Sequence, residues 1–223
     1  MFAATGLTLL SNNAIPLRNN LIQNDAQNVI DISKSNKAIQ SFNVQLLIAE
    51  SQSKGIKLKD MPKEWFIMPD DSEINNPINA TIASLICSRE IELGNFYNAH
   101  KLIRSVLQKS PNMLGIYKTL LSLEIIYLDA IHQWASNEDI FNKLYALKKQ
   151  IAPLKRNISV QRVLYTVALI CENDSVKAVN HLLLFEKLSK KYPYQQELEN
   201  ERKLLELAKK TGAMLQIEKQ SKK

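Results

Sequence analysis

The amino-acid sequence predicts an all-α protein, and three observations support this fold class. From Asn76 onward, apolar residues recur with the 3.6-residue period of an amphipathic helix. The 223 residues include only five glycines and seven prolines, so long helices can run without interruption. Leu, Ile, Lys, Glu, Ala and Gln, which favour helix, are concentrated in the second half of the chain. We therefore expect helices and no β-sheet.

Two short helices are expected near the N-terminus. The stretch Phe2 to Leu10 is apolar enough for a short helix, which is then interrupted by Ser11, Asn12, Asn13 and Pro16. Asp25 can cap a second helix, which extends to about Ile32. The residues expected on the inward face of this second helix are Val29 and Ile30.

A clearer amphipathic helix is predicted over 38–53, and Gly55 is placed to end it, because glycine commonly follows a helix. The apolar residues expected on its inward face are Phe42, Leu46, Leu47 and Ala49. The next segment, 57–71, holds two Met-Pro pairs that oppose continuous helix. We expect its Trp65, Phe66 and Met68 to pack onto the helical body as a latch. The alternative is an exposed docking patch.

From Asn76 onward the expected helices follow one another closely. Asn76-Pro77 opens the first of them, because proline suits the first helical position. The helix over 112–134 is apolar on most of its faces and is expected to be central and largely buried. The expected ranges are 77–93, 95–109, 112–134, 138–151 with Asn137 as its cap, 159–171, 175–191 and 195–217.

The segment Gly94–Pro111, GNFYNAHKLIRSVLQKSP, has small and apolar residues where two antiparallel helices must touch. These residues are Gly94, Phe96, Ala99, Ile103, Val106, Leu107 and Pro111. The pattern resembles a tetratricopeptide helix-turn-helix hairpin, and the segment 173–193 echoes it loosely, with Ala178 in the place of Ala99. The two segments do not follow a regular spacing of about 34 residues. The resemblance therefore implies an irregular tetratricopeptide-like stack of helical hairpins, with a generic helical bundle as the alternative.

The formal net charge of +7 allows two interpretations. One is a nucleic-acid-binding surface, and the other, which we favour, is a helical protein with many surface lysines. Acidic residues are interleaved almost throughout, and no arginine-rich run occurs. Basic and aromatic residues also do not alternate as they do in proteins that bind single-stranded nucleic acid.

No complete active site is visible in the sequence. Cys87 and Cys171 lie in apolar helical patterns and are expected to be reduced core residues. His100, His132 and His181 are far apart, and no Cys/His spacing typical of a metal site occurs. The chain alone is therefore not expected to be a self-contained enzyme or to hold a cofactor.

Two stretches of the N-terminal third also resemble a known family. IPLRNNLIQNDAQNVIDI at 15–32 and LLIAESQSKGIKLKDMPKEWF at 46–66 are similar to bacterial site-2-protease-like intramembrane zinc metallopeptidases, at and just after their last core membrane helix. The resemblance implies that Asp25 matches a zinc ligand of that family, although Ala26 stands where the family usually has glycine. The family's H-E-x-x-H motif, which supplies two zinc ligands and the catalytic glutamate, is absent from this sequence. The resemblance thus implies zinc only where a complete peptidase exists.

The sequence is expected to have four parts. They are an apolar segment and loop resembling the end of a membrane peptidase core at 1–35, a helix with a Pro/Trp linker at 36–75, a tetratricopeptide-like domain at 76–217 and a basic tail at 218–223. The N-terminus lacks the positively charged start of a signal peptide and is shorter than the roughly 20 apolar residues of a spanning helix. We expect it to permit membrane association, with the chain in the cytoplasm or at the cytoplasmic face of a membrane.

The expected function is that of a non-catalytic helical protein-interaction domain, the cytosolic C-terminal part of a membrane metallopeptidase relative. A protein or peptide segment would bind on the concave face between hairpins, with Lys101, Arg104 and Lys118 as candidate contacts. One alternative is a fragment or subunit that completes a zinc peptidase with another polypeptide. A second alternative is a basic nucleic-acid-binding protein, which the charge pattern disfavours.

Overall fold

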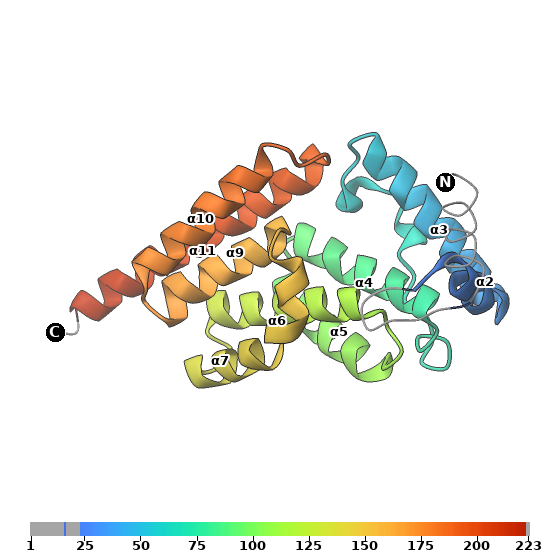
Figure 1. The fold of residues 1–223 in the computed structure, drawn as a ribbon, viewed down its shortest axis with the longest axis horizontal. Coiled ribbons are helices and arrows are strands. Elements are labelled where there is room, and N and C mark those ends of the chain that lie inside the picture. The colour runs from blue at the N-terminus through green and yellow to red at the C-terminus, as the bar shows by residue number, and fades with distance from the viewer. Residues whose placement is uncertain (1–15, 17–22, 222–223) are drawn as a thin grey trace, which may run out of the picture. The chain divides into compact units, whose positions relative to one another are not determined.

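A computed structural model of the chain describes Pro16 and residues 23–221, and this described part is mostly helical and contains no β-strand (Figure 1). The all-α fold class is therefore confirmed, and the tetratricopeptide-like arrangement stays a prediction. The helix predicted over Phe2 to Leu10 lies outside the described residues. The α-helices are α2 (Asp25–Ser33), α3 (Asn36–Ser53), α4 (Pro77–Glu92), α5 (Phe96–Lys109), α6 (Gly115–His132), α7 (Asn137–Ala146), α8 (Lys148–Ile151), α9 (Ile158–Thr166), α10 (Ser175–Ser189) and α11 (Gln195–Ser221).

The chain divides into two compact units. Unit 1 consists of Met1–Ser51 and Leu58–Lys118, and unit 2 consists of Gln52–Lys57 and Thr119–Lys223. Three 3-10 turns and one π-helix complete the described elements. They are η1 (Leu58–Asp60), η2 (Lys63–Trp65), η3 (Ala152–Leu154) and the π-helix η4 (Val167–Cys171).

The helices α4 and α5 form the predicted hairpin of unit 1. Asn76 caps α4 by accepting a hydrogen bond from the backbone N–H of Ile78, and Pro77 occupies the first turn. Gly94 joins the two helices with a φ of +81°, a left-handed conformation that glycine adopts without a side-chain clash. The residues of α5 that are buried in this hairpin are Ala99, Ile103 and Val106. The turn and the small inward residue are therefore where the sequence predicted them.

The latch predicted over 57–71 packs onto unit 1. Its Trp65, Phe66 and Met68 contact a buried apolar cluster that includes Met61 of the same segment. The remaining buried residues of this cluster are Ile48 of α3 and Ile82 and Ile86 of α4. Arg89 of α4 lies with its guanidinium carbon 4.9 Å from the centroid of the Phe66 ring, and its Nε donates a 3.1 Å hydrogen bond to the carbonyl of Leu58. The latch interpretation is confirmed, and the exposed patch is excluded.

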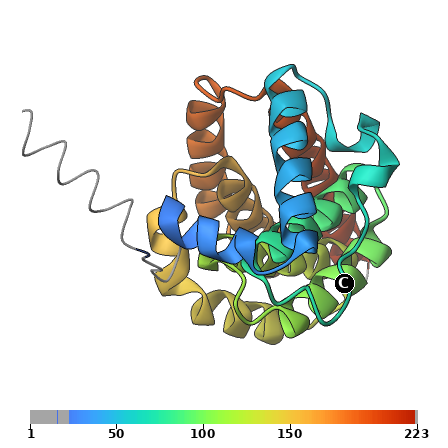
Figure 2. The ribbon, with the colours of Figure 1, turned by 90° about the vertical axis from the view of Figure 1, so that its right-hand side faces the viewer.

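The inward faces predicted for α2 and α3 are wrong. Val29 and Ile30 of α2 are 65% and 40% exposed, and Leu46, Leu47 and Ala49 of α3 are exposed as well. The residues that α2 and α3 bury are Asp31, Ala38, Ser41 and Ile48. Because apolar residues occur around most of α3, the period alone did not identify the buried face, and small side chains occupy it instead. Figure 2 shows that α2 and α3 run in different directions, with a short turn between them.

Unit 2 is built around α9, against which both α10 and α11 pack (Figure 1). The part of α6 from Thr119 onward is buried on most of its faces, as predicted for this helix. Gly212 of α11 allows a close approach to the π-helix, since a Cβ atom there would lie 2.7 Å from Cδ2 of Leu169. Two hydrogen bonds join the segment 52–57 to α11 within this unit. Gln196 donates to the carbonyl of Gln52 at 2.7 Å, and Lys57 donates to Glu199 at 2.7 Å.

Several helix boundaries in unit 2 differ from the prediction. Ser136, not Asn137, caps α7, because its Oγ accepts the backbone N–H of Asp139 at 3.1 Å. The predicted helix 138–151 is two helices, α7 and α8, and the predicted helix 159–171 changes to a π-helix at Val167. Helix α6 ends at His132, where the following residue has a φ of +54°. The predicted turn before α10 is present, with Asp174 accepting the N–H of Lys177 at 2.9 Å.

Candidate functional site

The three contact residues predicted from the sequence are on the surface of unit 1. Lys101 and Arg104 lie three residues apart on α5, so they share one face of that helix, and both are exposed. Lys118 is exposed on the first turn of α6. The structure therefore brings Lys101 and Arg104 together on one helix, while Lys118 is on the next helix.

The groove that a helical hairpin would offer beside α4 is filled by the chain itself. Twelve residues of α4 are buried, on more sides than α5 alone covers. The latch residue Met61 and Ile48 of α3 pack against Ile82 and Ile86 of α4. Nε2 of Gln45 in α3 also donates a 2.9 Å hydrogen bond to the carbonyl of Ile78. A partner segment therefore has no open apolar surface on this part of α4.

Asp25 is the exposed first residue of α2, and the predicted cap is its neighbour. The side chain of Asn24 accepts a 3.2 Å hydrogen bond from the backbone N–H of Gln27, so Asn24 is the N-cap and Asp25 lies in the first turn. Within the described residues, no group of three His, Cys, Asp or Glu side chains is arranged to hold a metal ion. The described part alone therefore does not fit a zinc site of three or four protein ligands.

None of the helices in the described part of the chain has the length and apolar character needed to cross a membrane. The apolar residues before position 16, on which membrane association was predicted, lie outside the described residues.

Helix α3 presents apolar side chains on its outward face, here called the α3 face and defined as Ile39, Leu46 and Leu47. Their exposed fractions are 44%, 54% and 42%. The spacing of seven and eight residues places them along one side of the helix over two turns. The helical period had predicted Leu46 and Leu47 to face inward, whereas Ile39 was not assigned to either face.

Helix α10 of unit 2 has a second exposed apolar row, here called the α10 face and defined as Val176, Val179 and Leu183. These side chains are 71%, 51% and 63% exposed. The opposite side of α10 is buried through Ala178, Phe185 and Ser189. Spacings of three and four residues align the α10 face along one side of the helix.

A buried charge cluster lies inside unit 2. Arg162 of α9 is fully buried and forms ion pairs with Glu124 of α6 at 2.5 Å and Glu201 of α11 at 2.7 Å. Burial disfavours the charged guanidinium, but these two carboxylates outweigh that effect and raise the pKa of Arg162. Burial also raises the pKa of Glu124, against the opposing effect of Arg162. The cluster therefore links α6, α9 and α11 through two buried ion pairs.

Tyr127 of α6 also belongs to this cluster. The hydroxyl of Tyr127 donates a 2.8 Å hydrogen bond to the carbonyl of Leu204, and burial raises its pKa. Among the described residues, Nη1 of Arg162 and Oε2 of Glu124 are buried without a hydrogen-bond partner. The sequence signal for this cluster is the presence of Glu124 and Arg162 inside the apolar runs of α6 and α9, which the helical period alone does not pair.

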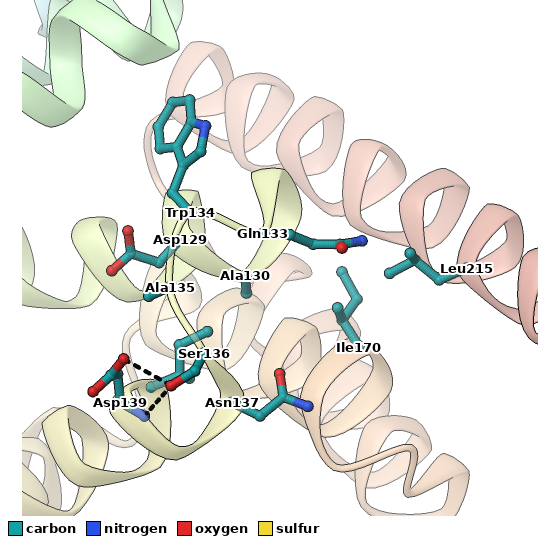
Figure 3. Close-up of a pocket in the computed structure, with 11 residues that line it drawn as sticks. Asp129, Ala130, Gln133, Trp134, Ala135, Ser136, Asn137, Asp139, Ile170 and Leu215 are labelled. Atoms are coloured by element: carbon teal, nitrogen blue, oxygen red, sulfur yellow. Dashed lines mark hydrogen bonds between the residues drawn. The ribbon is translucent and has the colours of Figure 1, made fainter.

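A pocket of about 530 Å³ lies beside the start of α7 (Figure 3). Ser136 donates a 2.7 Å hydrogen bond to Asp139, and Asp129 forms a 2.7 Å ion pair with Lys143. The Ser136 hydroxyl therefore makes two hydrogen bonds to Asp139, one to its backbone N–H and one to its carboxylate, as the cap of α7. In Figure 3 the ring of Trp134 points away from the other lining side chains, and it stacks on His132 with 4.4 Å between ring centroids.

The two cysteines, both expected in the core, differ in burial. Both are free thiols; Cys87 is fully buried and Cys171 is half-buried. Burial raises the pKa of Cys87 to about 12, so its reactive thiolate form is disfavoured.

No protein-family model, curated protein or solved structure matches this chain.

Proposed function

We propose that this chain is a helical protein-interaction domain whose α3 face receives a helical segment of a partner protein. The observation that supports this proposal is the exposure of Ile39, Leu46 and Leu47 at helical spacing on one side of α3. Large apolar side chains in contact with water lose the free energy that burial provides, about 25 cal/mol per Å² of apolar surface. Large apolar side chains exposed on one side of a helix are therefore a common mark of an interaction site.

The chemistry of α3 favours an amphipathic helix as the bound segment. The exposed positions of α3 are Asn36, Ile39, Gln40, Asn43, Leu46, Leu47, Ala49, Glu50 and Ser53. Glu50 is the only charged residue among them, so the exposed side of α3 mixes apolar and polar residues and is almost uncharged. A partner helix with apolar residues at positions i, i+3, i+4 and i+7 matches the α3 face, because helices recognise one another through these anchors.

The α5 residues Lys101 and Arg104 are the alternative contact surface. They are exposed and charged, which is also the ordinary character of a solvated helix surface. An acidic partner segment would favour them, whereas an apolar one would favour the α3 face. An experiment that samples both surfaces distinguishes the two.

Site-specific photo-crosslinking tests the proposal. The photoreactive residue p-benzoylphenylalanine is placed at Leu46, or at Lys101 for comparison, and the full chain is irradiated in an extract of its source cells. We expect the Leu46 derivative to form a covalent product with one defined polypeptide, identified by mass spectrometry. Adding Ile39→Asp on the same face should abolish the product, while adding Val179→Asp on α10 should leave it. A product only from Lys101, or one that persists with Ile39→Asp, would contradict the proposal.

We further propose that the chain is a C-terminal part of an intramembrane zinc metallopeptidase relative. This proposal rests on the resemblance of the stretch 46–66 to that family, and this stretch covers the end of α3, the turn at Gly55 and the latch. Because this sequence lacks the H-E-x-x-H motif, a C-terminal part of such a peptidase would be preceded by that motif in the same gene. The DNA immediately upstream should encode such a segment in frame. An upstream sequence without it would remove this proposal and leave the α3 face unaffected.

A further inference from the structure

The α10 face of unit 2 is an apolar row with opposite charges at its two ends. The apolar middle is formed by Val176, Val179 and Leu183. More than half of each of these residues is exposed. Glu172 and Asp174 lie at the amino end of α10, where Asp174 is the N-cap. At the carboxyl end the exposed basic residues are Lys187, Lys190 and Lys191.

We propose that a second copy of this chain docks on the α10 face, with the two α10 helices antiparallel about a two-fold axis. In that arrangement Val176 of one copy lies opposite Leu183 of the other, and the reverse pair forms by symmetry. Lys187 follows Leu183 by four residues within α10, and Glu172 lies two residues before the N-cap Asp174 at the amino end of that helix. Antiparallel pairing therefore brings Lys187 of each copy to the acidic end of the other.

The acidic residues at the amino end of α10 can exchange their present ion pair for one with a second copy at little cost in free energy. Glu172 and Asp174 contact Lys177 of their own chain at 3.0 Å and 3.8 Å, and Lys177 is 58% exposed. Ion pairs of this kind at the surface contribute little to stability, because water screens them. The antiparallel arrangement also places the positive end of each helix dipole beside the negative end of the other. A second copy thus supplies both the apolar and the charged complement of this face.

The size of the contact sets the expected strength of the dimer. Three apolar side chains from each copy cover much less than the roughly 800 Å² per partner that stable complexes bury. We therefore expect a reversible dimer whose population rises with protein concentration, not a permanent one.

Sedimentation velocity of the full chain over a range of concentrations tests the proposal. The mass should rise from that of the 25.4 kDa monomer toward twice this value as the concentration increases. Leu183→Asp should keep the chain monomeric, because it buries a charge in the apolar row. Val29→Asp, at an equally exposed apolar site of α2 in unit 1, is the matched control and should dimerise like the unaltered chain. An unaltered chain that stays monomeric at every concentration overturns the proposal and leaves the α10 face to a different partner.

Charge reversal tests the antiparallel register. Lys187→Glu alone and Glu172→Lys alone should each weaken self-association, because like charges then meet at both ends. An equal mixture of the two variants should associate again, since each Glu at position 187 faces a Lys at position 172 and the unaltered pair forms at the other end. Circular dichroism should show the same helix content for both variants, which places the effect at the interface. A mixture that associates no better than the separate variants contradicts the proposed pairing.

Discussion

The guanidinium carbon of Arg162 lies 4.3 Å from the centroid of the Tyr127 ring, inside unit 2. The ring covers the cation on one face while Glu124 and Glu201 bind its nitrogen atoms. A charge without water around it depends on such partners, because removing them leaves an uncompensated ion in a medium of low polarity. The α6, α9 and α11 helices are thus joined by one side chain.

Arg162→Met is expected to destabilise the chain by about 3–5 kcal/mol, because it leaves Glu124 and Glu201 close together without their counter-ion. Urea unfolding at neutral pH measures this change in the free energy of unfolding. The triple variant Arg162→Met, Glu124→Gln, Glu201→Gln removes all three charges and should recover part of the loss. A single variant as stable as the unaltered chain would show that the ion pairs do not hold these helices together.

Ala99→Leu is expected to destabilise the hairpin of unit 1. Ala99 is fully buried on the inner side of α5, so a larger side chain overpacks the contact at a cost of about 1–3 kcal/mol. Lys101→Leu, at an exposed position of the same helix, is the matched control and should change the free energy of unfolding little. Equal effects of the two substitutions in chemical denaturation would mean that Ala99 is not in a close helix contact.

Gly94→Ala is expected to cost about 1 kcal/mol through backbone strain alone. The φ of Gly94 is +81°, and no atom lies within 4 Å of the position where a Cβ would be added, so steric packing does not contribute. Gly94→Asn should cost less than Gly94→Ala, because asparagine tolerates the left-handed conformation better. Thermal unfolding of both variants gives the order, and the reverse order would contradict a strained turn.

His181 is expected to make the chain less stable in mild acid. Burial lowers the pKa of His181 below its ordinary value, and its Nδ1 lies 2.8 Å from Oε1 of Gln161. The unfolded chain therefore takes up a proton first as the pH falls below about 6.5, which favours unfolding until the lower pKa of the folded state is reached. The His181→Gln variant should therefore lose less stability on acidification than the unaltered chain. The free energy of unfolding at about pH 7.5 and about pH 5.5 measures this difference. If the variant kept the pH dependence of the unaltered chain, the loss of stability in mild acid would come from other titratable groups.

Trp65→Ala is expected to release the latch from unit 1. Trp65 is half-buried against the apolar cluster that includes Met61 and Ile82, so its removal should cost about 1–3 kcal/mol. Hydrogen exchange of α4 amides should then become faster, because the latch covers this helix. Ile67→Ala, at a neighbouring position that is 61% exposed, should have a much smaller effect.

The sequence alone determined the features that depend on a few neighbouring residues. Gly94 and Gly55 end helices with positive φ, and the Asn76-Pro77 pair begins one. These outcomes follow from the absence of a Cβ atom in glycine, from the fixed φ of proline and from the side-chain acceptor of asparagine. The same local chemistry, added over many residues, predicted the all-α fold class.

Only the tertiary structure decided which side of each helix is buried and which charges meet. Leu46 and Leu47 were predicted to face inward, but Ile48 and the small residues Ala38 and Ser41 do so instead. A helix period shows where apolar residues recur, whereas burial depends on which elements from distant parts of the chain pack against that helix. For the same reason the pairing of Arg162 with two glutamates, each almost 40 residues away, became visible only when α6, α9 and α11 were placed together. The α3 and α10 faces, on which both proposals depend, are the apolar surfaces that this packing left uncovered.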